Sequence, residues 1–178
     1  MKRTNLIAFI LIAAALVPQT ASAQDKAYFG VAMLNSIYRD AASHDHYSNG
    51  LVGRLGYDIA RYLAVETHFG GSIGTESNVN NANGKGQLTD FYSAFLCLNS
   101  HFGNKRIYAL GGMSYGTREF SGSASAAATR DSKTGTSYGA GIEAYHNDDI
   151  SFNLEWVRYF DNSDFAMNAY NLGLLVRF

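Results

Sequence analysis

The charged residues with the most regular spacing recur at alternate positions within short apolar stretches of the chain. Because successive side chains of a β-strand point to opposite faces, we expect these charges to share one face of a sheet. That face also carries many glycines, whereas the opposite face carries large aliphatic and aromatic residues. The charged residues are Arg54, Asp58, Glu66, Glu143, Glu155 and Arg177.

Carboxylates and guanidinium groups that leave water together must be paired or hydrogen-bonded. We therefore expect these side chains to form ion pairs, with Arg54 and Glu66 as cross-strand partners. The simplest chemistry for them is structural, a plug of salt bridges.

Histidine gives weaker signals. His44 and His46 flank an aspartate and could chelate a metal ion, but no third ligand follows at a diagnostic spacing. His68 shares the charged face, while His101 and His146 lie near short turns. A catalytic triad needs a nucleophile, a base and an acid within reach of one another, and no serine lies at a matched strand spacing beside His44 or His46. The sequence therefore predicts no metal site, no cofactor and no enzyme activity.

The first 23 residues have the organisation of a secretory signal peptide. Lys2 and Arg3 precede an apolar run at 6–17, and Ala21-Ser22-Ala23 is a small-residue cleavage site. We expect residues 1–23 to be removed on export and residues 24–178 to form one domain.

Composition narrows the class of that domain. The formal net charge is −1 with mixed signs, so no basic surface for nucleic acid is indicated. The single cysteine, Cys97, cannot form an internal disulfide and is expected to be an inert strand residue. The single proline, Pro18, lies in the signal peptide, and its absence elsewhere suits a continuous sheet.

Period-two alternation of apolar and polar residues recurs in about eight segments, each bounded by turn residues. Eight is a strand number that closes small barrels. The expected strands cover about 28–38, 51–59, 63–70, 90–101, 107–116, 138–143, 150–157 and 170–178.

The expected connections between these strands alternate in length. Short turns are predicted at 59–61, 103–104 and 147–149, longer polar loops at 39–47, 75–86 and 121–134, and a short loop at 161–164. Short turns on one side and longer loops on the other are typical of outer-membrane barrels.

Turn length also predicts which residues face each other. A three-residue turn at 59–61 would place Arg54 opposite Glu66, and a two-residue turn at 103–104 would place Leu96 opposite Gly111. Both registers keep like faces together, which a slip of one residue would not.

The direction of the polar face separates a soluble barrel from a membrane barrel. A soluble ligand-binding barrel is apolar inside, whereas a membrane barrel is apolar outside. An eight-stranded lumen is narrow, so we expect small residues and ion pairs inside it and the apolar face against lipid. Arg158, near the outer end of its strand, could then reach lipopolysaccharide phosphates. The sequence predicts an all-β fold, an eight-stranded antiparallel up-and-down transmembrane β-barrel, with the soluble barrel as the alternative.

The final segment, YNLGLLVRF, alternates to its last residue, with Tyr170, Leu172, Leu174, Val176 and Phe178 on one face. It resembles the closing strand of bacterial outer-membrane β-barrel families, which ends in phenylalanine. The segments GLVGRLGYDIARYLAVETHFG and NLEWVRYF resemble parts of the outer-membrane protein A-like eight-stranded family, and the chain is similar to small barrels of the X and Ail type. The resemblance covers essentially the whole chain after the signal peptide. It implies that the barrel assembly machinery reads the final stretch.

The resemblance also implies a monomer in the bacterial outer membrane, in contact with outer-membrane lipid and lipopolysaccharide. We expect a structural or surface-interaction protein that supports envelope integrity, with adhesion through protruding strand edges as an added role. One alternative is a small ion-conducting channel whose lumenal charge pairs switch partners, as the resembling family implies. A less favoured alternative is a lipid A-modifying enzyme with a serine, a histidine and an acid on the outer surface.

Overall fold

A computed structural model of the chain describes residues 27–39, 45–72, 77–78, 84–122, 129–161 and 166–178. The expected signal peptide and His44 lie outside these residues, and the side chain of His46 is not among those described. Within the described ranges, no helix is long and apolar enough to cross a membrane.

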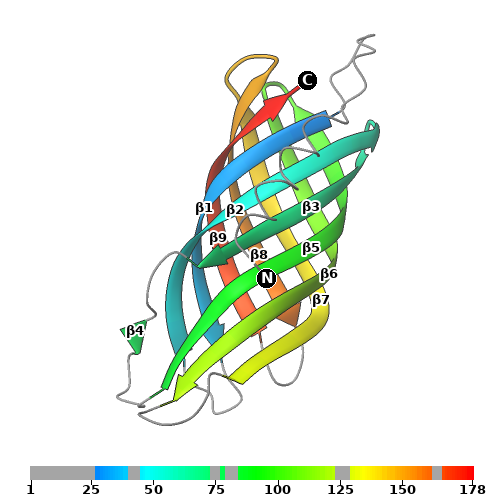
Figure 1. Cartoon of the computed structure of the whole chain (residues 1–178). Coiled ribbons are helices and arrows are strands. Elements are labelled where there is room, and N and C mark those ends of the chain that lie inside the picture. Colours follow the sequence, from blue (N-terminus) through cyan, green and yellow to red (C-terminus); the bar gives the residue numbers. More distant parts are fainter. Residues whose placement is uncertain (1–26, 40–44, 73–76, 79–83, 123–128, 162–165) are drawn as a thin grey trace.

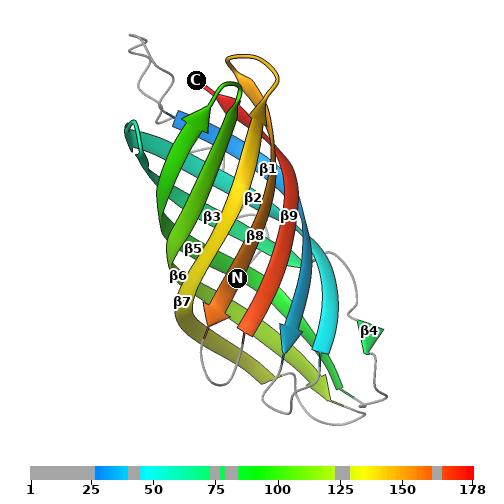
Figure 2. The same cartoon turned by 180° about the vertical axis from the view of Figure 1, so that it is seen from behind.

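Eight long antiparallel strands form a closed barrel (Figure 1). The first strand pairs with both the second and the last, and Figure 2 shows this seam between β1 and β9. Among the described residues, the short β4 pairs with β2 near its first residues, at positions 46 and 47. The predicted fold class is confirmed. The strands are β1 (Ala27–Arg39), β2 (Asp45–Ala60), β3 (Leu63–Ser72), β4 (Ser77–Asn78), β5 (Gly84–Phe102), β6 (Lys105–Gly122), β7 (Thr129–Tyr145), β8 (Ile150–Asp161) and β9 (Ala166–Arg177).

Burial alternates along the barrel strands and gives the direction of each face. Large apolar side chains point outward, with exposed fractions of 63% for Met33, 64% for Leu98 and 59% for Leu172. Charged side chains such as Arg54 and Glu66 are buried in the lumen. This polarity is that of a membrane barrel and confirms the inside-out prediction.

The short connections lie at one end of the barrel. They join β2 to β3, β5 to β6 and β7 to β8, and β9 ends beside them (Figure 1). The β5–β6 turn has the predicted two-residue form, with Phe102 opposite Lys105 and Leu96 opposite Gly111. Because outer-membrane barrels have their short turns on the periplasmic side, we call this end the periplasmic end and the opposite end the outer end.

The predicted β2–β3 register is wrong by two residues. Arg54 lies opposite His68, and Glu66 lies opposite Gly56. The pairing is irregular between Asp58 and Ala60, so the turn is displaced toward the third strand. Because the shift is even, every side chain keeps its predicted face.

Several strands, most of all β2, β5, β6 and β7, extend further than predicted at the opposite end. β5, β6 and β7 continue into segments that were expected to be loops, as the lower part of Figure 1 shows. Backbone pairing in this region places residue 118 opposite residue 131 and residue 119 opposite residue 130. The sequence here is polar and lacks the period-two alternation of apolar residues, which is why it was predicted to be loop. We call residues 84–90, 117–122 and 129–135 the protruding sheet.

Large lumenal side chains lie beside glycines of the neighbouring strand. Tyr28 is opposite Gly56, and Tyr108 is opposite Gly141. A Cβ atom built on either glycine would overlap the ring of its tyrosine partner. The expectation of mainly small lumenal residues was therefore incomplete: the lumen also holds Tyr28, Phe91, Phe95, Tyr108, Tyr159 and Phe160.

This arrangement predicts different effects for two glycine substitutions. Gly56→Ala forces a methyl group against Tyr28 and should lower the free energy of unfolding by about 1–3 kcal/mol. Gly111→Ala faces outward with no atom within 4 Å of its added Cβ, and should change stability by about 0.5 kcal/mol or less. Urea unfolding from lipid vesicles measures both, and equal effects would contradict the packing described.

Candidate functional site: a packed polar lumen

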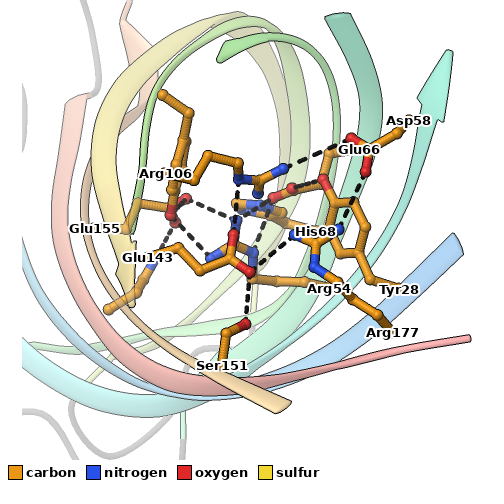
Figure 3. A network of polar contacts seen from close by, with 12 residues as sticks. Tyr28, Arg54, Asp58, Glu66, His68, Arg106, Glu143, Ser151, Glu155 and Arg177 are labelled. Atoms are coloured by element: carbon orange, nitrogen blue, oxygen red, sulfur yellow. Dashed lines mark hydrogen bonds and ion pairs between the residues drawn. The ribbon is translucent and has the colours of Figure 1, made fainter. Parts of the chain in front are cut away.

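The charged side chains converge from six strands onto the periplasmic half of the lumen. Each reaches the interior because it has the inward parity of its strand. Figure 3 shows them as one connected group. We call this group the lumen network; its members are Tyr28, Arg54, Asp58, Glu66, His68, Arg106, Tyr108, Glu143, Ser151, Glu155 and Arg177.

Glu66 is the centre of one half of this network. Its Oε1 atom lies 2.6 Å from Arg54 Nη2 and 2.5 Å from His68 Nε2. Its Oε2 atom accepts a hydrogen bond of 2.5 Å from the Tyr28 hydroxyl. Gly56 stands opposite Glu66 and its space is occupied by the Tyr28 ring, while Arg54 reaches Glu66 from two residues along the strand. The ion pair predicted from the sequence therefore forms in a different register.

Glu143 is the centre of the other half. Its Oε2 atom lies 2.7 Å from Arg106 Nε, and its Oε1 atom lies 2.8 Å from Arg177 Nη2. Ser151 donates a hydrogen bond of 2.5 Å to the same carboxylate. Arg177 also bonds Asp58 through Nη1 at 3.1 Å. Arg177 comes from the last strand, so this carboxylate ties β7 to the β9 side of the seam.

Three arginines and three tyrosines stack alternately and join the two halves. Arg54 lies over Tyr108 at 5.5 Å from the ring centroid, and Arg106 lies over Tyr108 at 5.0 Å and over Tyr28 at 5.2 Å. Arg177 lies over Tyr28 at 4.7 Å and over Tyr145 at 5.2 Å. Cation–π contacts of this kind are strongest where water is excluded. We call this stack the arginine–tyrosine column.

The outer half of the lumen is less charged. His68 Nδ1 is hydrogen-bonded to the Tyr159 hydroxyl at 2.8 Å, and Phe91 and Phe95 pack against the Tyr159 ring. A ladder of serine hydroxyls, Ser93, Ser114 and Ser137, crosses β5, β6 and β7 with Oγ–Oγ distances of 2.6 Å. The serine contacts connect neighbouring strands. His68 is bonded through one ring nitrogen to Glu66 and through the other to Tyr159.

One set of side chains has the composition of a metal site. Glu66, His68 and Glu155 have potential ligand atoms within 4.8 Å of one another. However, Arg54 lies 2.6 Å from Glu66 and 3.2 Å from Glu155. The guanidinium group thus supplies the positive charge between the two carboxylates, and the donor set does not fit a metal ion.

The structure brings together all of the charged residues singled out in the sequence. It adds Arg106, Tyr28 and Tyr108, which the sequence reasoning did not include. Arg106 could have been predicted from the sequence. The 103–104 turn places it opposite His101, and it lies two residues from Tyr108, so both side chains point into the lumen. Cys97 is buried in the lumen, His101 stacks on Tyr145 near the periplasmic end, and His146 lies in the β7–β8 connection.

The final stretch lies on the outer surface of the barrel. The residues that were expected to share one face are all exposed to the exterior: Tyr170, Leu172, Leu174, Val176 and Phe178. The amide of Phe178 donates to the carbonyl of Ala27 at 3.0 Å, so strand pairing continues to the last residue. Between these outward residues, Leu175 and Arg177 point into the lumen.

Comparison with known proteins identifies the class that this barrel and lumen define. The chain belongs to the outer membrane protein beta-barrel domain family, whose model matches residues 6–178. The protein is therefore an eight-stranded β-barrel of the bacterial outer membrane, as predicted. A search of curated protein sequences gives no match.

Solved structures show the same fold. Ail, the attachment invasion locus protein of Yersinia pestis, is 17% identical with a TM-score of 0.65, covering 88% of this chain and 100% of that one. Neisserial surface protein A is 11% identical with a TM-score of 0.62, covering 85% and 97%. The N-terminal barrel of Pseudomonas aeruginosa OprF is 17% identical with a TM-score of 0.54, covering 88% and 100%.

The buried ion pair predicts a large cost for losing one partner. Arg54→Met leaves Glu66 and Glu155 without their guanidinium group and should lower the free energy of unfolding by about 3–5 kcal/mol. Arg54→Met combined with Glu66→Gln should cost clearly less than the sum of the two single changes. Urea unfolding of the three variants measures this coupling.

The exposed pair Arg158–Asp161 is the matched control. Its atoms are 2.9 Å apart, but both side chains are about one third exposed, so Arg158→Met should cost about 1 kcal/mol or less. Strictly additive effects at Arg54 and Glu66 would show that the two charges do not interact as described.

Proposed function

We propose that this protein has no enzymatic activity and acts as a structural and surface-interaction component of the outer membrane that supports envelope integrity. The observation that carries the proposal is that the lumenal charged side chains are paired with one another and with the barrel's own tyrosines. Arg54, Arg106 and Arg177 all contact carboxylates and tyrosine rings of the barrel itself. Groups committed to one another in this way are suited to holding strands together.

The same packing does not favour the alternative of a small channel. Glu66 and Glu143 are each held by several donors, so switching one partner leaves the carboxylate bonded to the others. The lipid A-modifying alternative requires a histidine on the outer rim. Among the histidines with described side chains, His68 is committed to Glu66 and Tyr159, and His101 and His146 are near the periplasmic end.

The protruding sheet supports the surface-interaction part of the proposal. The β3–β5 pairing ends at Gly70 and Phe91, whereas the β5–β6 pairing continues to Gly84 and Gly122. On the side away from β6, residues 84–90 therefore have no strand partner in the part of the chain that the structure describes. An open strand edge can add a strand from another protein, which gives adhesion a physical basis.

Structural relatives are consistent with such a role. Ail of Yersinia pestis is an attachment invasion locus protein, and it has been solved in complex with the heparin analogue sucrose octasulfate. We extend only the general surface role to this chain. We further propose that it is a monomer, that lipopolysaccharide and outer-membrane lipid surround it, and that the barrel assembly machinery reads its final stretch.

A shortened variant separates the two parts of the proposal. Thr117 and Ser132 are opposite each other on β6 and β7, so residues 118–131 can be replaced by Asn-Gly in a two-residue hairpin. We expect a strain lacking the protein to admit more of a hydrophobic dye. The shortened variant should restore this barrier as well as the unmodified protein does, while attachment of the cells to surfaces falls to the level of the deletion strain.

The matched control is the unmodified protein expressed at the same level, with folding checked by the mobility shift between unheated and boiled samples on a denaturing gel. A deletion strain with a normal barrier and normal attachment would contradict the proposal. So would stable single-channel currents from the purified protein in planar bilayers, which would favour the channel.

A further inference from the structure

We propose that the outer surface of β8, β9, β1 and β2 carries a binding site for the sugar headgroup of an outer-leaflet glycolipid. This inference rests on the proposed role in the envelope and names the lipid class and the residues involved. The site consists of Asn35, Asn49, Trp156, Arg158, Asn168 and Tyr170, which we call the amide patch.

Strand register places these residues side by side. Asn35 is opposite Asn49 on one side and opposite Tyr170 on the other, and Tyr170 is opposite Trp156. In the next outward row toward the outer end, Asn168 is opposite Arg158, and on β1 and β2 this row continues with Ile37 and Tyr47. All have the outward parity of their strands, and Asn35, Asn49 and Tyr170 are exposed. The patch is therefore continuous across four neighbouring strands.

A sharp change of polarity marks the inner border of the patch. The next outward row toward the periplasm runs Leu51, Met33, Leu172 and Leu154, and all four side chains are exposed and apolar. An amide facing hydrocarbon would lose its hydrogen bonds at a cost. The border between the two rows therefore fits an amphipathic molecule, with its acyl chain along the apolar row and its headgroup against the amides.

The chemistry of the patch selects a sugar. Each asparagine amide offers two donors and an acceptor to hydroxyl groups, and the rings of Trp156 and Tyr170 offer flat apolar faces with a polar edge. Arg158 is already paired with Asp161 through both Nε and Nη2 at 2.9 Å. The patch is thus electrically neutral overall, which suits hydroxyl groups better than phosphates.

The patch is confined to one sector of the barrel. Among the described side chains of β3, β5, β6 and β7, no asparagine points outward. Their outward residues at the outer end of the apolar band include Phe69, Tyr92 and Tyr115, which are aromatic. A general interface with headgroups would need no such concentration of amides on one side.

The test is lipid retention. The barrel is placed in nanodiscs containing equal amounts of lipopolysaccharide and phosphatidylglycerol, and native mass spectrometry counts the lipids that remain bound on release. The unmodified protein should retain the glycolipid about tenfold over phosphatidylglycerol, a ratio that two or three hydrogen bonds can supply. The Asn35→Leu/Asn49→Leu variant should lose this preference. Leucine suits a lipid-facing position, so the variant should still fold and show the gel mobility shift.

Thr67→Leu is the matched control, because Thr67 is an exposed outward polar residue on β3, outside the patch. It should keep the preference of the unmodified protein. Emission from Trp156, the single tryptophan, gives a second readout and should shift with the glycolipid only where the patch is intact. Equal retention of both lipids by the unmodified protein, or equal behaviour of the two variants, would overturn the inference. If the inference is overturned in this way, a weakened barrier in the deletion strain would still support the proposed envelope role.

Discussion

The burial of three guanidinium groups in a narrow lumen is the constraint on which the rest of the structure depends. Arg54, Arg106 and Arg177 cannot be left without partners in a space that excludes water. The barrel satisfies them with carboxylates at the sides and tyrosine rings above and below. Because Tyr28 belongs to the first strand and Arg177 to the last, the same contacts cross the seam that closes the barrel.

The glycines follow from that constraint. Several large side chains enter the narrow lumen at positions where the neighbouring strand has a glycine. Gly56 leaves this space for Tyr28, and Gly141 leaves it for Tyr108. The abundance of glycine in the sequence thus reflects lumen packing as well as turns. On the outside no such limit applies, and large apolar residues face lipid.

Much of this could be predicted from the sequence because the signals are local. Period-two alternation defined the strands and their faces, and the Gly103-Asn104 turn fixed the β5–β6 register. The β2–β3 register could not be derived, because the irregularity near Ile59 depends on the fold around it. The protruding sheet was missed because its polar segments lack the period-two alternation of apolar residues that marked the other strands. The stacking of arginines on tyrosines required five strands to converge.

The most direct test of this account is hydrogen exchange at the arginine side chains, followed by NMR of the barrel in lipid nanodiscs. Arg54 donates a hydrogen bond through Nε to Glu66, Arg106 Nε lies 2.7 Å from Glu143, and both guanidinium groups are buried over tyrosine rings, so their Nε protons should exchange slowly and be shifted by the ring currents. Arg61 is the internal comparison, because it lies over Tyr62 at 5.3 Å but is exposed, and it should exchange fast. Exchange at Arg54 and Arg106 as fast as at Arg61 would show an open, hydrated lumen and would contradict the packed arginine–tyrosine column.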